Sequence, residues 1–345
     1  MRTHLAILSC LAAAFATLPI SSAAQNPWPA ARPISIIVPF TAGGSVDATA
    51  RLIGQRLGER LKQSVVIENV AGGGGTIGTI GTIGTIGTIG TIGTIGTARA
   101  AQAAADGYTL LLGADSAIAT ASLVNPAAVR YDALNDLTPI GLVTTAPMLL
   151  VARPGLAASN LAEIVSLARA QPGKLSYATS GVGTVLHLAM EMIKQQAKID
   201  IVHVPYRGGA QIVADITGNQ VDLAMLISIS AVPQVLAKKI NGIAVTDGKR
   251  LAALPDVATV AESPGFKGFD VVAWTGLFAP ARLPTAIVEQ LNRELAEVLK
   301  SDEVRGKLAQ QGALAGSGSA AAFAGFVERE RTRYAGVVRA ANIRE

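Results

Sequence analysis

Short apolar segments alternate along this chain with longer segments in which apolar residues recur every three or four positions. The first apolar segment, "ISIIVPF" at 34–40, has the length and the β-branched content of a buried strand. After it, apolar residues recur at spacings of four, three, four and four from Val46 to Leu61, which places them on one face of a helix. Strands that alternate with helices in this way predict an α/β fold with largely parallel sheets.

The alternation continues towards the C-terminal end of the chain. Further strands are expected at 64–70, 108–114, 139–145, 147–154, 175–180, 199–206, 221–226, 242–247 and 271–280. Helices are expected at 160–171, 184–197, 211–219 and 284–301, and an alanine-rich helix is expected before 108. The 345 residues are enough for about two domains of roughly 150 residues each.

The first 24 residues have the three parts of a secretory signal peptide. Arg2 supplies the basic start, an apolar run follows from Leu5 to Ile20, and small residues end the segment at Ala24. The run of 16 residues is short for a membrane-spanning helix, which needs about 20. We therefore expect cleavage after Ala24 and a soluble protein that is exported to the periplasm.

The only cysteine, Cys10, lies inside this N-terminal segment. A chain that begins at Gln25 has no thiol, which excludes disulfides, cysteine catalysis and cysteine-based zinc sites. The nine residues ahead of Cys10 are too few for a lipoprotein signal, so we expect no lipid anchor.

The charged and histidine residues argue against nucleic-acid binding and catalysis. The net charge is +5, but lysine and arginine are scattered and no basic run is interleaved with aromatic residues, so no nucleic-acid partner is expected. His187 falls in a predicted helix and His203 in a predicted strand, where each is more typical of a core or wall residue than of a metal ligand. Because the chain also lacks a G-x-S-x-G elbow and a P-loop lysine, we expect no enzyme activity, metal or cofactor.

Three junctions share one design, in which a strand leads through a turn rich in glycine and serine into a helix. Their sequences are "VPFTAGGSVD", "SYATSGVGTVLHL" and "VPYRGGAQIVADI". Ligands of open α/β sheets bind at the carboxyl ends of strands, and the free N–H groups of a helix N-terminus favour an anion. Several such junctions around one cleft would suit a carboxylate. The alternative is that glycine only permits tight turns between strand and helix.

Polar residues within these junctions also allow more than one interpretation. Asp47 can complement the dipole of its helix, or it can hold the glycine turn or accept an ammonium or hydroxyl group of a ligand. Ser180 and Thr184 can cap a helix, donate to a ligand, or do both. The residues alone leave these alternatives open.

A Gly-Thr-Ile triplet is repeated seven times from Gly75 to Ile95. The start of the repeat satisfies the G-x-G-x-x-G pattern of dinucleotide-binding proteins. However, glycine at every third position produces that spacing automatically, the preceding strand is the second, and no acidic residue follows at about 20 positions, the nearest being Asp106. No dinucleotide site is therefore expected. A period of three fits neither a helix nor a strand, so the segment is expected to be a flexible or loosely extended surface insert.

Eight segments of the chain, taken in order, resemble the Bug receptors, which are the periplasmic substrate-binding proteins of tripartite tricarboxylate transporters. The segments are "IIVPFTAGGSVDATAR", "VVIENVAGGGGTIGT", "ADGYTLLLG", "YDALNDLTPIGLV", "LSYATSGVGTVLHLAMEMI", "VPYRGGAQIVADITGNQVDLAM", "LPDVATVAES" and "AWTGLFAPARLPTAIVEQLN". Together they extend over essentially the whole chain after the signal peptide. Any one of them would be a weak signal, whereas eight in order are specific.

The resemblance implies a type II periplasmic-binding-protein fold, with two α/β lobes around a ligand cleft. The chain is expected to cross to the second lobe near Asp136 and to return near Ala244. Lobe 1 would then comprise residues 33–135 and 244–345, and lobe 2 residues 136–243.

The resemblance also implies that backbone amides and bridging waters hold a small carboxylate. Matched by motif, the candidate ligand-binding residues are Phe40, Gly43, Ser45, Asp47, Ser180, Gly181, Gly183, Thr184, Gly208, Gly209 and Asp222. Ser116 is a further candidate because it follows Asp115 at a strand end that would face the cleft, although "GADSAIATASL" departs from the family pattern there. This departure leaves the ligand class open.

The same resemblance gives an expectation for the repeat and for the function. The family carries one "GTIGT" at this position, and removing six of the seven triplets, 18 residues, leaves an alignment without a gap. The chain is expected to be a monomeric receptor without enzyme activity that captures a small carboxylate or related organic solute. It would deliver this solute to a membrane transporter of the tripartite tricarboxylate type. The alternative is a sensor that passes the signal to another protein.

Overall fold

The computed structural model describes residues 28–40, 42–43, 45–70, 93–206, 209–310 and 312–344. The predicted signal peptide, Gly208 and the repeat up to Thr91–Ile92 lie outside the described residues. Gly93, Thr94 and Ile95, the last triplet of the repeat, are described. Thr94 and Ile95 begin helix α2 (Thr94–Ala101), so the last triplet leads directly into the expected alanine-rich helix.

The described strands form one connected sheet, whose order is β2-β1-β3-β9-β4-β7-β5-β6, with β8 and β10 also paired to β4. Their bounds are β1 Ile34–Val38, β2 Val65–Asn69, β3 Thr109–Ala114, β4 Leu137–Ala152, β5 Ser176–Thr179, β6 Val202–Pro205, β7 Leu223–Ile227, β8 Asn241–Val245, β9 Val272–Pro280 and β10 Leu314–Ala315. Strand β1 is parallel to β2 and β3, and β5 is parallel to β6 and β7. Strands β4 and β9 run antiparallel to their neighbours.

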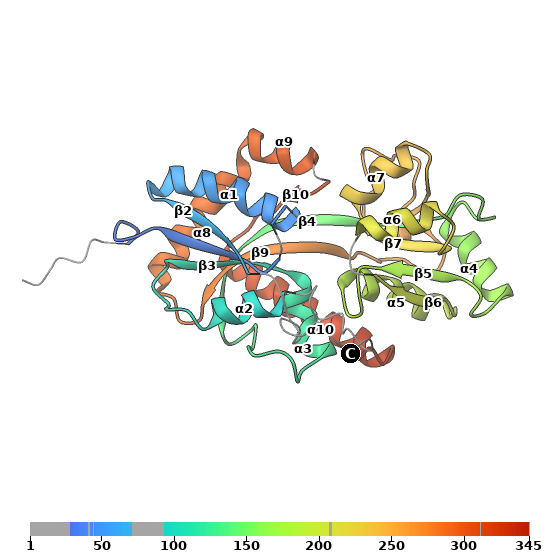
Figure 1. Ribbon diagram of the computed structural model, residues 1–345, viewed down its shortest axis with the longest axis horizontal. Coiled ribbons are helices and arrows are strands. Elements are labelled where there is room, and N and C mark those ends of the chain that lie inside the picture. The colour runs from blue at the N-terminus through green and yellow to red at the C-terminus, as the bar shows by residue number, and fades with distance from the viewer. Residues whose placement is uncertain are drawn as a thin grey trace, which may run out of the picture.

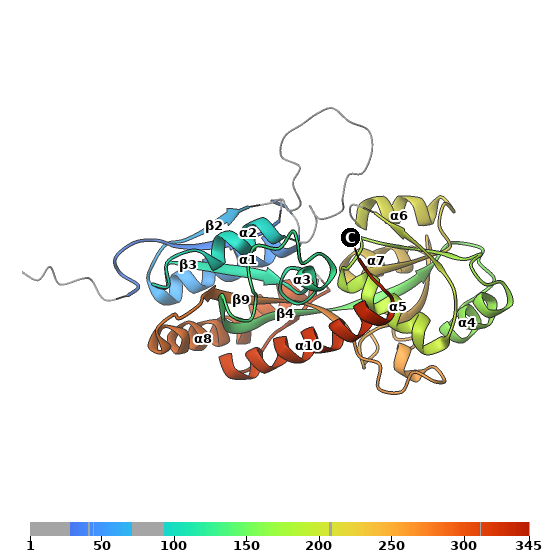
Figure 2. The same cartoon turned by 90° about the horizontal axis from the view of Figure 1, so that it is seen from below.

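Helices cover both groups of strands (Figure 1). Besides α2, they are α1 Ser45–Leu61, α3 Ala121–Val124, α4 Leu161–Ala170, α5 Val185–Ala197, α6 Gly209–Thr217, α7 Ser228–Leu236, α8 Thr285–Lys300, α9 Asp302–Gln310 and α10 Ala320–Ala340. A π-helical turn, η2 (Ser116–Thr120), precedes α3, and a 3-10 turn, η3, spans Val260–Glu262. Helix α10 contacts β4 and η2 and extends as far as α5 (Figure 2).

The apolar strands and amphipathic helices build one hydrophobic cluster within each lobe, and a third cluster extends through both lobes, from Phe278 of β9 to Met225 of β7. In lobe 1, Ile36 of β1 and Ile53 of α1 are completely buried in one hydrophobic cluster with Leu291 of α8. In lobe 2, Ile212 of α6 and Val245 of β8 belong to another cluster. The α/β class is confirmed, but the sheet is mixed and not largely parallel, because the long strands β4 and β9 pair antiparallel with their neighbours.

Two long strands, β4 and β9, join the lobes (Figure 1). Residues 137–147 of β4 pair with β9 in lobe 1, and residues 148–152 pair with β7 and β8 in lobe 2. The segments 139–145 and 147–154 therefore form one strand instead of two. Pro147 lies where β4 changes partners, so the proline that suggests a break between two strands marks the passage between lobes.

The passages between lobes lie further along the chain than the positions expected from the sequence. The first is near Pro147 in β4, after Asp136, because β4 continues without interruption. The second follows Val271, after Ala244, because β8 pairs with the lobe 2 half of β4 and the Val271 N–H donates to the Thr246 carbonyl. Strand β9 then returns the chain to lobe 1.

Candidate functional site

A cavity of about 430 Å³ lies between the two lobes. Gly43 and Ala48 line it from lobe 1. The lobe 2 side is formed by residues of the β5–α5 junction, of α6, and of the β7–α7 junction: Ser180, Leu186, Gly209, Ile212, Leu226, Ile227, Ile229 and Ser230. A larger open groove of about 1100 Å³ lies elsewhere, beside α2 and β1. We consider the first cavity as the candidate site because both lobes and several strand ends meet there.

Four helices begin at this cavity. Helix α1 starts at Ser45, α5 at Val185, α6 at Gly209 and α7 at Ser228, and residues within or just before the first turn of each helix line the cavity. The first N–H groups of a helix have no partner inside it, and the helix dipole makes that end partly positive. Because four such ends surround one cavity, the site favours an anion.

Asp47 fixes the first glycine turn. Its carboxylate is only 3% exposed, and Oδ2 accepts hydrogen bonds from the Gly43 N–H at 2.8 Å and from Arg51 Nε at 3.1 Å. Oδ1 accepts from Asn69 Nδ2 at 3.0 Å. The hydrogen bond from Arg51, followed by that from Gly43, lowers the pKa of Asp47 to about 2. Both carboxylate oxygens are thus engaged in holding the turn, which favours this role over binding a ligand's ammonium group.

The second turn, from Thr179 to Thr184, is held by its own hydrogen bonds. The Thr184 hydroxyl donates to the Gly181 carbonyl at 2.9 Å and accepts from the His187 N–H at 3.4 Å, so Thr184 caps helix α5. The Gly183 N–H donates to His187 Nδ1 at 3.1 Å. Gly183 has φ +72°, and a Cβ there would lie 2.6 Å from Val124 in α3 of lobe 1. Glycine is therefore needed both for the turn and for the close approach of the lobes.

The two histidines support this turn from beneath. The rings of His187 and His203 stack with centroids 3.9 Å apart, and His203 Nε2 lies 2.7 Å from the Thr179 hydroxyl. Burial lowers the pKa of His187 to about 4 and that of His203 to about 3, so both rings are neutral near pH 7. The sequence predicts them as core or wall residues. Their link to the turn was not predicted, although Gly183 and His187 stand four residues apart, the spacing of an i, i+4 contact.

The structure distributes the predicted site residues between the cavity wall and its support. Gly43, Ser180 and Gly209 line the cavity. Asp47 lies in the first turn of α1, and Gly181, Gly183 and Thr184 lie in the turn before α5. The Phe40 ring lies near Gly93, and the Phe40 backbone carbonyl accepts a hydrogen bond from Asn69 Nδ2 at 3.2 Å. Gly208 and the side chain of Ser45 lie outside what the structure describes.

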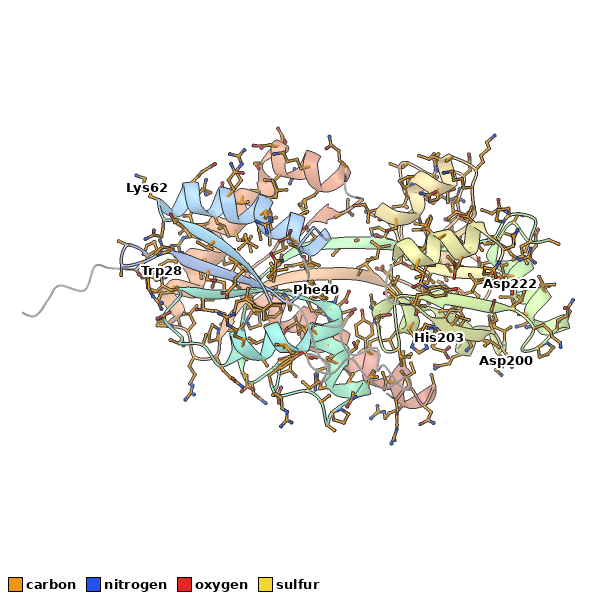
Figure 3. The ribbon with its side chains drawn as sticks, in the orientation of Figure 1. Trp28, Phe40, Lys62, Asp200, His203 and Asp222 are labelled. Atoms are coloured by element: carbon orange, nitrogen blue, oxygen red, sulfur yellow. The ribbon has the colours of Figure 1, made fainter. Side chains whose placement is uncertain are left out.

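The structure does not bring Asp222 to this group. Asp222 immediately precedes β7, whereas the cavity follows that strand, so the residue lies at the opposite edge of the sheet. Figure 3 shows it at the outer end of lobe 2, away from Phe40. There its Oδ1 accepts from Arg153 Nε at 2.9 Å and its Oδ2 from the Ser176 N–H at 2.9 Å. Asp222 thus connects the end of β4 to the start of β5 within lobe 2.

Ser116 and Asp115 are joined to a strand that links the lobes. The Ser116 hydroxyl donates to Asp115 Oδ1 at 2.8 Å, and the Trp274 N–H of β9 donates to Asp115 Oδ2 at 3.0 Å. Burial raises the pKa of Asp115 to about 6. Neither residue is among those that line the 430 Å³ cavity. Their contacts fix β9 next to the end of β3.

The apolar part of the cavity lining was not predicted from the sequence. Ile227 and Ile229 lie where β7 ends and α7 begins, and α7 was not predicted. Proline at 233 and several β-branched residues make "SISAVPQVL" a poor helix by local propensity. These residues could have been found from their position in the chain, because residues that follow β7 lie at the same sheet edge as the glycine turns.

Two classes of site are absent from the described part of the chain. Among these residues, no group of three or more histidine, cysteine, aspartate or glutamate side chains is arranged to hold a metal ion. No described helix is both long and apolar enough to cross a membrane.

The model of one protein family, described as the tripartite tricarboxylate transporter family receptor, matches residues 49–343. The chain belongs to this family. BugT from Bordetella pertussis is 32% identical over 309 residues, which cover 90% of this chain and 89% of BugT. A UPF0065 protein in the tcbD-tcbE intergenic region of Pseudomonas sp. strain P51 is 32% identical over 95% of this chain and 91% of its own length.

Solved structures of similar proteins agree with this assignment. R. palustris Rpa4515 with adipate is 34% identical, with a TM-score of 0.76, over 91% of this receptor and 98% of that chain. MatC from Rhodopseudomonas palustris with bound malate is 31% identical, with a TM-score of 0.72, over 89% and 99%. The periplasmic binding protein BugD is 30% identical, with a TM-score of 0.73, over 91% and 99%. The receptor therefore has the two-lobed periplasmic-binding-protein fold and belongs among solute-binding proteins, not enzymes.

Proposed function

We propose that this receptor captures a small carboxylate in the cavity between its lobes and delivers it to a membrane transporter of the tripartite tricarboxylate type. The convergence of four helix N-termini on one cavity carries the proposal, because the first N–H groups of a helix have no partner inside it and the helix dipole makes that end attractive to an anion. The family and the acids named with two similar structures, adipate and malate, support the same ligand class.

The strands between the lobes provide a physical route from binding to a change of shape. A ligand that contacts Gly43 on one side and Ser180 or Gly209 on the other interacts with both lobes at once. Such a ligand binds the closed arrangement better than an open one and therefore shifts the population towards closure. Strands β4 and β9 are the elements about which the lobes would move.

Export is part of the same proposal. The basic, apolar and small-residue parts of the first 24 residues support export to the periplasm with cleavage after Ala24, which would leave Gln25 as the N-terminus. The intact mass of the protein recovered from the periplasm should match residues 25–345. A mass that retains Cys10 with an added lipid would contradict this part.

A thermal-shift screen of residues 25–345 against organic acids, amino acids and aromatic acids tests the binding proposal. A ligand present at 100 times its dissociation constant stabilises the folded state by about 2.7 kcal/mol, which a thermal shift detects. Uptake of the identified acid should then fall in a strain that lacks the receptor. Normal uptake together with a lost transcriptional response would instead indicate a sensor.

A further inference from the structure

One side of the cavity is hydrocarbon. Ile212 of α6 and Leu226 of β7 form a buried floor, with exposed fractions of 0% and 1%. Ile227 and Ile229 are partly exposed and line the cavity at the start of α7, while Leu186 lines it from α5. These side chains come from three helices and one strand, so the apolar wall is built by several elements of lobe 2.

The polar groups of the cavity are few and of one kind. Among the described lining residues, only Ser180 and Ser230 have polar side chains, and both are uncharged. The helix N-termini contribute backbone N–H groups, which suit carboxylate oxygens. The cavity thus combines N–H donors at the strand ends with a wall that offers no described polar partner to the rest of a ligand.

Asp47 of α1 and Glu191 of α5, carboxylates in two helices that begin at the cavity, already have partners. Asp47 is engaged by Gly43, Arg51 and Asn69, as described above. Glu191, further along α5, accepts from the Tyr177 hydroxyl and from Lys194 Nζ, each at 2.6 Å. A ligand ammonium would have to compete with these bonds.

We propose that the ligand is a carboxylate whose body is unsubstituted hydrocarbon, aliphatic or aromatic, in preference to hydroxylated acids and amino acids. This inference rests on the proposed function of the cavity. Each methylene buried on the apolar wall should strengthen binding about fourfold. A hydroxyl or ammonium group buried there without a partner should weaken binding about tenfold or more. The volume of about 430 Å³ is in the lower part of the usual range for ligand sites, about 300–1000 Å³, which suits a small acid.

Calorimetric titration of residues 25–345 with matched acids tests the inference. Three pairs of acids are compared: adipate and galactarate, benzoate and 3,4-dihydroxybenzoate, and glutarate and glutamate. Galactarate has the carbon skeleton of adipate with four added hydroxyl groups. In each pair of which at least one acid binds, the unsubstituted acid should bind at least tenfold more tightly than its hydroxylated or amino-substituted partner. Equal or tighter binding of galactarate, dihydroxybenzoate or glutamate would overturn the inference and leave the carboxylate receptor intact. If no carboxylate in this set or in the wider screen binds, the proposed function itself fails.

A pair of variants on one helix locates the effect. Ile229→Ser changes the cavity wall, and Leu236→Ser changes a side chain that is 61% exposed further along α7, outside the cavity lining. Ile229→Ser should weaken binding of the preferred acid at least fivefold. It should also reduce the ratio of this affinity to the affinity for the hydroxylated partner. Leu236→Ser should leave both unchanged. An unaltered preference in a folded Ile229→Ser variant would contradict the assignment of this wall.

Discussion

The stacked rings of His187 and His203 link protonation to the turn that lines the cavity. His187 accepts the Gly183 N–H through Nδ1, and a protonated ring cannot accept there. Burial, followed by the charge of Lys194, lowers the pKa of His187 to about 4 from the ordinary histidine value of 6.5. Burial, followed by the charge of His187, lowers the pKa of His203 to about 3. The neutral pair is thus part of the folded structure.

The pH dependence of stability follows from these lowered pKa values. The unfolded chain takes up protons near pH 6.5, before the folded chain does, so the free energy of unfolding should fall as the pH decreases from about 6.5 towards 4. His187→Asn keeps a possible acceptor for Gly183 but removes the titration. Denaturant unfolding between pH 7 and 4 should show a shallower loss of stability in this variant. Equal slopes for the two proteins would contradict the account.

At the scale of elements, the turn between β5 and α5 is limited by two separate constraints. Gly183 and Gly155 have similar φ angles, +72° and +75°, but only Gly183 has another residue within reach of a Cβ. Gly183→Ala should therefore cost about 1–3 kcal/mol more than Gly155→Ala, because the added methyl meets Val124. Denaturant unfolding of both variants measures the difference. Equal losses would mean that Val124 moves aside without cost.

The same two variants separate stability from ligand binding. Gly183 lies in a turn beside the cavity, whereas Gly155 follows β4 at the outer end of lobe 2. Ligand affinity should fall in Gly183→Ala and remain within about twofold of wild type in Gly155→Ala. Reduced affinity in both would indicate a general effect on folding.

The elements were predictable where local pattern and tertiary setting agree. The strands around β1, β2 and β3 and the helices α1, α4, α5 and α8 lie where hydrophobic periodicity places them. Helix α7 was missed because its propensity is poor, and it forms where Ile227 and Ala231 are partly or fully buried in lobe 2. The role of Asp222 could not be read from a motif, since only the position of β7 shows which edge of the sheet precedes it.

At the scale of the whole molecule, two lobes and their α/β class were expected, but the passages between them were displaced. The segment 137–152 looks like two strands in the sequence, because no local sequence pattern indicates that a single strand pairs in both lobes. The candidate site was predicted in part, since its glycine turns are visible in the sequence. Its apolar lining depends on which strand ends meet in space.

Deleting residues 75–92 tests the expectation that six triplets of the repeat are dispensable. The last triplet, which leads into α2, is retained in this variant. Shortening the connection from about 24 to about 6 residues should increase the free energy of unfolding by roughly 1.2 kcal/mol, because loop-closure cost grows as the logarithm of length. Denaturant unfolding and limited proteolysis check this, and ligand affinity should change by less than about tenfold. A large loss of affinity would mean that the repeat contributes to binding.

Titration calorimetry on Ser180→Trp tests most directly the claim that a carboxylate binds between the lobes. Ser180 lines the cavity, so an indole there should fill space that the ligand needs, and Ser317→Trp provides a control at an exposed position outside the lining. With the acid that gives the largest thermal shift, wild type and Ser317→Trp should bind one equivalent with the same affinity. Ser180→Trp should show no measurable binding while its unfolding temperature without ligand stays within a few degrees of wild type. Unchanged affinity in Ser180→Trp would contradict the location of the site.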